Sequence, residues 1–205
     1  MADAAPNKTS PPSIEAQLLR DHQPDLQGMI RAYSLTRFMA IARLRDFTLK
    51  EHDAIDSYVY GSHQAMLLVA SKDLKVTFKA HFNVRDLTIP SLKAEAAGEA
   101  AKLMRLTQDF FREYANLVAG GIKQQLQSCG IICGISLPIV TSGYDEMIFS
   151  DTLRKTRLYD FWKIRSATSE FTCTAHVDVF DSTRLATYSF KGVASTQDEG
   201  SLEFL

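Results

Sequence analysis

Residues 109–122 read DFFREYANLVAGGI, and the spacing of their polar and apolar side chains decides the fold. At about 100° per residue, Asp109, Glu113, Asn116 and Gly120 fall within one narrow sector of a helical wheel. The opposite side is broad and apolar, and consists of Phe110, Phe111, Tyr114, Leu117, Val118 and Ile122. The stretch therefore predicts a helix that packs its apolar side on a sheet and holds a polar stripe toward solvent.

The sequence around this stretch extends the helix over about residues 94–127, because Ala, Leu, Met, Glu, Lys and Gln dominate there. Pro90 precedes the segment, Gly130 follows it, and Gly98 is expected to break its first part. Gly120 lies inside the helix, where a glycine costs about 1 kcal/mol relative to alanine. Two explanations stay open for Gly120: a partner that approaches closely, or a bend beside a packed neighbour.

Segments on both sides of the helix show the alternation of β-strands. Residues 74–82 place an apolar side chain at every second position, and the apolar run 66–70 before them predicts a hairpin. Residues 158–165, 172–180 and 184–190 predict three further strands after the helix. This order indicates an α+β fold in which an antiparallel sheet packs against the long helix.

Histidines and cysteines on the predicted strands have ordinary structural explanations. His81 and His176 alternate with apolar neighbours, so both are expected to point to solvent rather than to bind a metal. Cys173 lies on the apolar side of its strand, where a thiol behaves as a small core residue. The three cysteines form no Cys-x-x-Cys pair, which predicts reduced thiols, no zinc site and no intrinsic cofactor.

The region before the sheet is expected to be mostly helical. Residues 1–13 are polar and contain prolines, which predicts a flexible tail. Ser13 is suited to cap a short helix from Ile14, and an apolar stripe from Leu26 to Leu44 predicts a second helix. That second helix is expected to pack on the domain or on a second subunit. Its acidic and basic neighbours are balanced, so no nucleic-acid partner is expected.

The length of 205 residues suits one main domain. After the tail we place a helical extension at 14–62, the domain at 63–195 and a C-terminal tail at 196–205. A chain without residues 1–61 is expected to fold but to expose apolar surface. The sequence shows neither a signal peptide nor an apolar run of about 18 residues, so we expect a cytoplasmic protein without a membrane span.

Two motifs, in this order, resemble those of the CheC/CheX-type chemotaxis phosphatases. Their residues are Asp109, Glu113, Asn116 and Gly120, followed by the segment ISLPIV at 135–140 and by Gly143. The resemblance spans about residues 66–190, and the first sixty residues have no counterpart in it. The chain holds a single Glu-x-x-Asn element, which makes it more similar to CheX than to CheC-like members, which carry two.

The resemblance implies a protein aspartyl-phosphate phosphatase that acts on a phosphorylated CheY-like receiver domain in chemotaxis or two-component signalling. Asn116 would orient the attacking water and Glu113 would pair with a receiver lysine, and these two are the implied catalytic residues. Asp109 and Gly120 would contact the partner, the receiver would supply Mg²⁺, and the family's dimers imply a homodimer. The alternative is a noncatalytic receiver-binding or scaffold module, because flagellar switch proteins share the fold without this motif.

Overall fold

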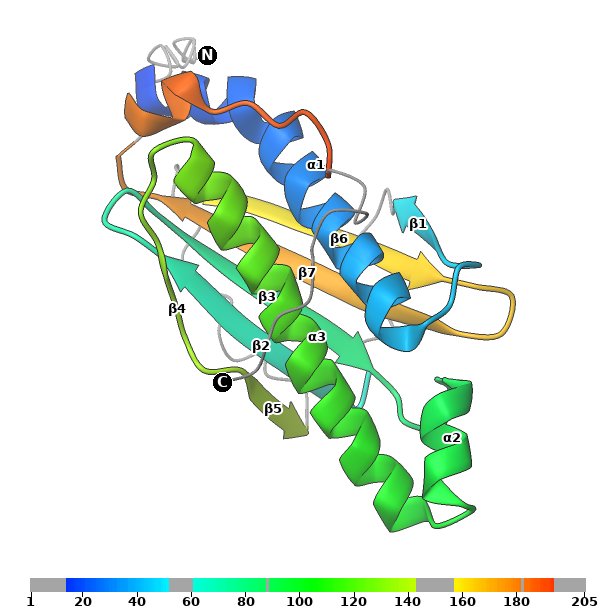
Figure 1. The fold of residues 1–205 in the computed structure, drawn as a ribbon. Helices are drawn as coiled ribbons and strands as arrows, with labels where there is room; N and C mark the ends of the chain where they lie inside the picture. Colours follow the sequence, from blue (N-terminus) through cyan, green and yellow to red (C-terminus); the bar gives the residue numbers. More distant parts are fainter. Residues whose placement is uncertain (1–13, 52–60, 88, 143–156, 182, 194–205) are drawn as a thin grey trace, which may run out of the picture.

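One antiparallel sheet carries two long helices on the same face (Figure 1). The computed structural model describes residues 14–51, 61–87, 89–142, 157–181 and 183–193. The helices are α1 (Ile14–Ala42), α2 (Pro90–Ala96) and α3 (Ala100–Ser128), and a short 3-10 helix, η3, spans Thr183–Thr187. The strands are β1 (Thr48–Glu51), β2 (His63–Ala70), β3 (Leu74–Phe82), β4 (Gly134–Ile135), β5 (Ile139–Ser142), β6 (Arg157–Arg165) and β7 (Glu170–Val179). The predicted α+β class, with an antiparallel sheet against a long helix, is confirmed.

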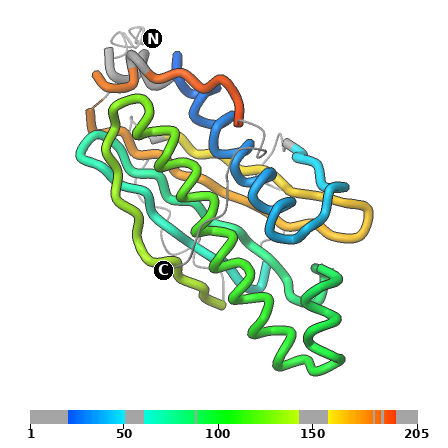
Figure 2. The backbone as a smooth tube through the Cα atoms, viewed as in Figure 1, coloured from blue at the N-terminus to red at the C-terminus, as the bar shows by residue number. Residues whose placement is uncertain are grey.

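The strands follow the order β1-β6-β7-β3-β2-β4, and β5 pairs with β2 beside β4. The predicted hairpin is confirmed, because β2 and β3 pair with Leu67 opposite Phe78 and Val69 opposite Val76. Two of the three strands predicted after the helix are present as β6 and β7, which pair from Arg157 opposite Asp178 to Arg165 opposite Glu170. The backbone trace shows α1 and α3 side by side across this sheet (Figure 2).

The segment after α3 forms one edge of the sheet in two short pieces, β4 and β5. Pro138 separates them, because proline has no N–H to donate to a strand ladder. Ser136 spans the interruption: its backbone N–H donates to the Leu68 carbonyl (2.9 Å), and its Oγ accepts from the Leu68 N–H (3.0 Å). The side chain thus replaces a backbone acceptor, and the ISLPIV segment stays attached to β2.

The helices differ from the expectation in one place. A single helix, α1, spans Ile14–Ala42 with Pro24 inside it, so the prediction of two separate helices is wrong. A proline inside a helix removes one backbone hydrogen bond and crowds the carbonyl four residues before it, which can bend a helix without ending it. Pro24 is exposed. The predicted break at Gly98 is confirmed, because this glycine has φ +86° and separates α2 from α3.

The stripe on α1 packs against the domain itself. Phe38 is fully buried, and its ring centroid lies 4.9 Å from that of Phe47, 5.5 Å from that of Tyr114 and 4.6 Å from that of Phe171. This helix was expected to pack on the domain or on a second subunit, and the structure shows that it packs on the domain. The boundary at residue 62 stays a prediction, but residues on both sides of it belong to one hydrophobic core.

The segment 184–190 is not a strand, so that prediction is wrong. Residues 183–187 form η3 instead, and Leu185 and Tyr188 are both buried. A spacing of three places two side chains on the same face of a helical turn, whereas strand neighbours that share a face are two apart. The Tyr188 hydroxyl donates to the Met29 sulfur (3.1 Å), so this segment covers the start of the buried stripe on α1.

The polar side chains of the central strands are less exposed than the alternation of polar and apolar residues predicts. His81 is buried, and its Nε2 lies 3.2 Å from Thr174 Oγ1, while His176 is only partly exposed. The prediction that both histidines point to solvent is therefore wrong for His81. Because β3 and β7 lie in the middle of the sheet, their polar side chains are neighbours and remove one another from water. The prediction for Cys173 is confirmed, since its thiol is fully buried in the core.

A bidentate ion pair joins α1 to β6. Arg31 Nε and one of its terminal nitrogens donate to the two carboxylate oxygens of Asp160, at 2.8 and 2.7 Å. The Asp160 side chain is only 5% exposed, so this pair exchanges little with water. Two parallel charge-assisted hydrogen bonds restrict orientation as well as distance, which helps to set how α1 crosses the sheet.

We predict that Phe38→Ala lowers the free energy of unfolding by about 4 kcal/mol, because the substitution removes a fully buried ring and leaves a cavity among aromatic neighbours. Phe180→Ala is the control, since Phe180 is 51% exposed and should cost less than about 1 kcal/mol. Urea unfolding measures both. Similar losses in the two variants would contradict the assignment of α1 to the core.

A chain that lacks residues 1–61 also lacks the Phe38 contacts, so the packing of α1 argues against a domain that folds without it.

Candidate functional site

The polar stripe of α3 points away from the sheet, as the helical wheel predicts. Asp109, Glu113 and Asn116 are exposed, and Gly120 is half-buried. The opposite side of the helix holds buried residues at the predicted positions Phe110, Phe111, Tyr114, Val118 and Ile122, whereas Leu117 is half-buried. Since one face is held by the core, the stripe has a defined direction.

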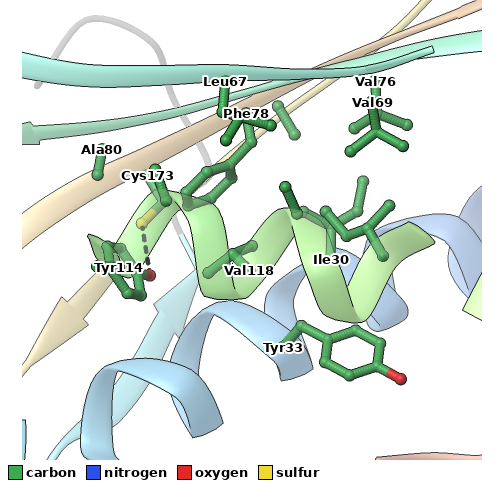
Figure 3. Close-up of a cluster of buried hydrophobic side chains, with 14 of the residues drawn as sticks. Ile30, Tyr33, Leu67, Val69, Val76, Phe78, Ala80, Tyr114, Val118 and Cys173 are labelled. Carbon is green, nitrogen blue, oxygen red and sulfur yellow. Dashed lines mark hydrogen bonds between the residues drawn. The ribbon is translucent and has the colours of Figure 1, made fainter. Parts of the chain in front are cut away.

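Aromatic contacts hold the buried side of α3 at the level of the stripe. The ring of Phe111 stacks on that of Phe82 in β3, with centroids 3.9 Å apart and planes 4° from parallel. Tyr114 packs against Phe78 and reaches between α3, the sheet and α1 (Figure 3). These contacts involve residues directly beside Arg112 and Glu113, so the backbone that carries the exposed side chains is fixed from behind.

A buried chain of hydrogen bonds joins α3 to α1 and β6 behind the stripe. The Tyr114 hydroxyl donates to the backbone carbonyl of Ser34 (3.0 Å), and the indole N–H of Trp162 donates to Ser34 Oγ (2.9 Å). Burial raises the pKa of the Tyr114 hydroxyl well above its usual value, and the nearby Cys173 thiol raises it further. Tyr114 therefore stays a neutral hydrogen-bond donor over the physiological pH range, and its role is structural.

The exposed side chains differ in their local partners. Asp109 forms an ion pair with Arg112 one turn along the helix. Within the described ranges Glu113 and Asn116 make no side-chain hydrogen bond or ion pair, so the carboxylate and the carboxamide are both available to a partner. A carboxamide can donate and accept at once, which suits a group that must orient a water molecule.

The two adjacent glycines of α3 have different surroundings. A Cβ at Gly121 would lie 2.3 Å from the Tyr33 ring, so α1 packs directly onto this position. A Cβ at Gly120 would meet nothing within 4 Å. The close neighbour that could explain a helical glycine is therefore at Gly121, and the structure offers no internal reason for Gly120.

The second motif borders α3 along the β4–β5 edge, which contacts the helix. This edge exposes two large apolar side chains, Leu137 (85%) and Ile139 (50%). Gly143, the last residue of the motif, lies outside the described residues. The structure thus brings α3 and the ISLPIV segment together on one side of the molecule, although 14 residues lie between Gly120 and Ile135 in the chain.

Across the described ranges, no group of three or more His, Cys, Asp or Glu residues could hold a metal ion. Among the helices in those ranges, none has both the length and the apolar composition that a bilayer crossing needs.

Comparison with solved structures shows which fold this chain has. No protein-family model and no curated protein sequence matches the chain. Among solved structures, CheX from Vibrio vulnificus superposes with a TM-score of 0.56 at 17% identity, over 75% of this chain and 99% of that one. A CheC-like protein from Shewanella oneidensis gives 0.59 at 16% identity, over 76% and 99%. This chain has the CheX-like fold.

A third CheX-like structure is that of CheX in its complex with CheY, BeF₃ and Mg²⁺ from Borrelia burgdorferi. It superposes with a TM-score of 0.55 at 9% identity, over 73% of this chain and 94% of that one. At such identities the likeness concerns the fold, and the predicted resemblance to the CheC/CheX type is confirmed at that level. The CheX-like fold covers about three quarters of the chain and nearly all of each relative.

Two features of the site were missed at the level of sequence. One is the ion pair between Asp109 and Arg112, for which the sequence signal is their spacing of three residues, at which helical side chains meet. The role of Ser34 in anchoring Tyr114 and Trp162 could not be found, because these residues are far apart in the chain. The roles of Asp109, Glu113, Asn116 and Gly120 toward a partner stay predictions.

We predict that Gly120→Ala raises the free energy of unfolding by about 1 kcal/mol, because alanine favours a helix and the added methyl group meets open space. Gly121→Ala is the matched control and should destabilise the protein, since its methyl group collides with the Tyr33 ring. Thermal and urea unfolding of both variants measure the difference. Equal effects at the two positions would contradict the packing described for α1 and α3.

Proposed function

We propose that this protein is a phosphatase that hydrolyses the aspartyl phosphate of a CheY-like receiver domain. The observation that carries the proposal is the exposed pair Glu113 and Asn116, whose side chains have no partner among the described residues and which lie on a helix that the core holds rigidly. The CheX-like fold supports it, because a CheX from Borrelia burgdorferi was crystallised with CheY, BeF₃ and Mg²⁺.

Asn116 would act by positioning. Its carboxamide enters the phosphorylation site of the receiver and orients a water in line with the phosphorus atom. The water oxygen forms a bond to phosphorus while the bond from phosphorus to the aspartyl oxygen breaks. The receiver carboxylate is regenerated, inorganic phosphate leaves, and the water's proton passes to the phosphate or to solvent. No covalent intermediate on this chain is needed.

Glu113 would set the register of the two proteins. One helical turn before Asn116, its carboxylate can accept a charge-assisted hydrogen bond from a receiver lysine near the phosphate. Asp109 and Gly120 would flank this contact, the first as a polar group and the second by leaving room for a partner backbone, as the open space at Gly120 allows.

Further parts of the proposal concern the surroundings of the reaction. Mg²⁺ would come with the phosphorylated receiver, where it neutralises charge on the phosphoryl oxygens. We also propose a homodimer and a cytoplasmic location for the protein, as the resemblance implies. A noncatalytic receiver-binding module is the second candidate, because an exposed Glu113 can fix a partner whether or not Asn116 promotes hydrolysis.

We expect Asn116→Ala to slow receiver dephosphorylation by about 100-fold or more while receiver binding persists, because the substitution removes only the group that orients the water. The experiment mixes the protein with a phosphorylated CheY-like receiver and Mg²⁺ and follows phosphate loss. Gln124→Ala is the matched control, since it removes an exposed amide from the same helix. If the wild type binds the receiver without accelerating phosphate loss, the noncatalytic candidate replaces the phosphatase.

We expect Glu113→Gln to weaken receiver binding by about tenfold and to leave the melting temperature unchanged, because an exposed carboxylate adds little to folding but much to a charge-assisted contact. Glu95→Gln on α2 is the control for loss of an exposed negative charge. Calorimetric titration with the activated receiver measures affinity. A large melting loss with unchanged affinity would show that Glu113 is structural.

A further inference from the structure

Strand β1 forms the edge of the sheet opposite to β4 and β5, and among the strands of the described ranges it pairs only with β6 (Figure 1). The outer side of an edge strand presents backbone N–H and C=O groups with which an extended peptide can pair. At the other edge, Pro138 interrupts the backbone donors between β4 and β5. Of the two edges, β1 is therefore the one with a continuous strand, four residues long.

A groove of about 560 Å³ lies between β1 and α1. Its walls are formed by Leu49 of β1 and by Pro24, Gln27, Gly28, Arg31 and Ala32 of α1. Leu49 is opposite the buried Ile164 in the register, so it lies on the face of the sheet that the helices cover. A strand added to β1 would place every second side chain on this face, beside the groove.

The lining of the groove suits an apolar side chain. Four of its six residues are proline, glycine, alanine and leucine. Arg31 also lines it, but the bidentate pair with Asp160 compensates the arginine charge. An apolar group that enters the groove therefore meets no uncompensated charge from this arginine.

The opposite face of the sheet carries cations at the same edge. Lys50 is directly opposite Lys163 in the register, and Arg165 follows two residues later on that face. Glu170 lies among them, with its carboxylate 2.8 Å from Lys163 Nζ and 3.8 Å from Arg165 Nε. The hydrogen bond from Lys163 lowers the pKa of Glu170, and the charges of Lys163, Arg165 and Lys50 lower it further. Within the described ranges Lys50 is exposed and forms no ion pair, so its charge is available to a partner.

The loop before β1 adds to this positive charge. Arg43, Arg45 and Asp46 are all exposed there. With Glu51 at the end of β1 included, the edge and its loop contain five cations and three carboxylates, a net charge of +2. Like charges directly opposite each other on neighbouring strands are unfavourable, and a carboxylate placed beside Lys50 would offset this repulsion.

We infer that β1 is a docking edge for an extended acidic peptide segment of a partner protein, which joins the sheet as a further strand. The backbone of the segment pairs with β1, and an acidic side chain lies beside Lys50. The next side chain along the segment is apolar and enters the groove at Leu49. The partner segment thus alternates acidic and apolar residues. The inference is independent of the proposed phosphatase, because it uses neither Glu113 nor Asn116.

A second copy of this chain fits the edge less well than an acidic segment does. Pairing β1 with β1 would bring a second Lys50 and a second set of loop arginines to the same place, where like charges repel. Lysine on an edge strand is a common protection against self-pairing of this kind. The positive edge therefore disfavours other copies and favours a strand of opposite charge.

The test titrates a fluorescein-labelled decapeptide, in which glutamate alternates with valine, with the full chain and follows fluorescence anisotropy. We expect this acidic peptide to bind, and a peptide with lysine in place of glutamate to bind about tenfold more weakly. The acidic sequence with N-methylated amides throughout cannot donate to a strand ladder, so it should also bind about tenfold more weakly. Equal binding of the three peptides, or no binding of the acidic one, would overturn the inference.

A charge reversal at the edge tests the electrostatic contact. Lys50→Glu should weaken binding of the acidic peptide by about fivefold and strengthen binding of the lysine peptide, because it reverses the charge beside the added strand. Lys72→Glu is the matched control, since Lys72 is exposed between β2 and β3, at the other end of the sheet. Both variants should keep the wild-type melting temperature, because both side chains are exposed. If the two variants bind both peptides alike, the inference is wrong.

Two further measurements test the groove and the location. Ala32→Leu narrows the groove and should weaken binding of the acidic peptide by about fivefold, whereas Ala40→Leu, at an exposed position on the same helix, should not. Hydrogen–deuterium exchange of the β1 amides should slow when the peptide is bound. Protection at the β4–β5 edge instead, or protection of β1 that rises with protein concentration in the absence of peptide, would overturn the inference.

Discussion

The burial of one face of α3 between the sheet and α1 is the constraint on which the other features depend. Phe111 stacks on Phe82 of the central strand β3, and Tyr114 reaches α1 through the Ser34 carbonyl. Apolar burial supplies most of the free energy of such a contact, but it is not directional. The hydrogen bonds of Tyr114 and Trp162 add direction, because they are satisfied in only one relative placement of α1, α3 and β6.

A helix held in this way presents its outer side chains in a fixed direction. Glu113 and Asn116 sit next to buried residues in the chain, so their backbone positions are set by the core although their side chains are exposed. The proposed hydrolysis depends on positioning a water molecule, and for it this order would be present before the receiver binds. The contrast between Gly121, packed on Tyr33, and Gly120, open to solvent, shows how closely the inner and outer sides of α3 adjoin.

Helix α1 is as important for this core as α3. Arg31 and Phe38 connect α1 to strands β6 and β7, and Tyr188 closes over Met29 from the other end of the chain. Contacts of this kind join residues more than a hundred positions apart, so the N-terminal helix and the C-terminal segment complete one structure. The solved structures with the CheX-like fold match about three quarters of the chain.

The sequence by itself determined the long helix, its two faces, the β2–β3 hairpin and the strands β6 and β7, because each of these depends on a local periodicity of 3.6 or 2 residues. It also contained the stripe of Asp109, Glu113 and Asn116, since residues three and four apart in a helix share a side. Only the tertiary structure decided that α1 covers the sheet, that His81 is buried beside Thr174, and that residues 183–187 form a helical turn. Those features depend on which surfaces pack together. A local periodicity shows on which face of a strand or helix a side chain lies, but it does not show what packs against that face.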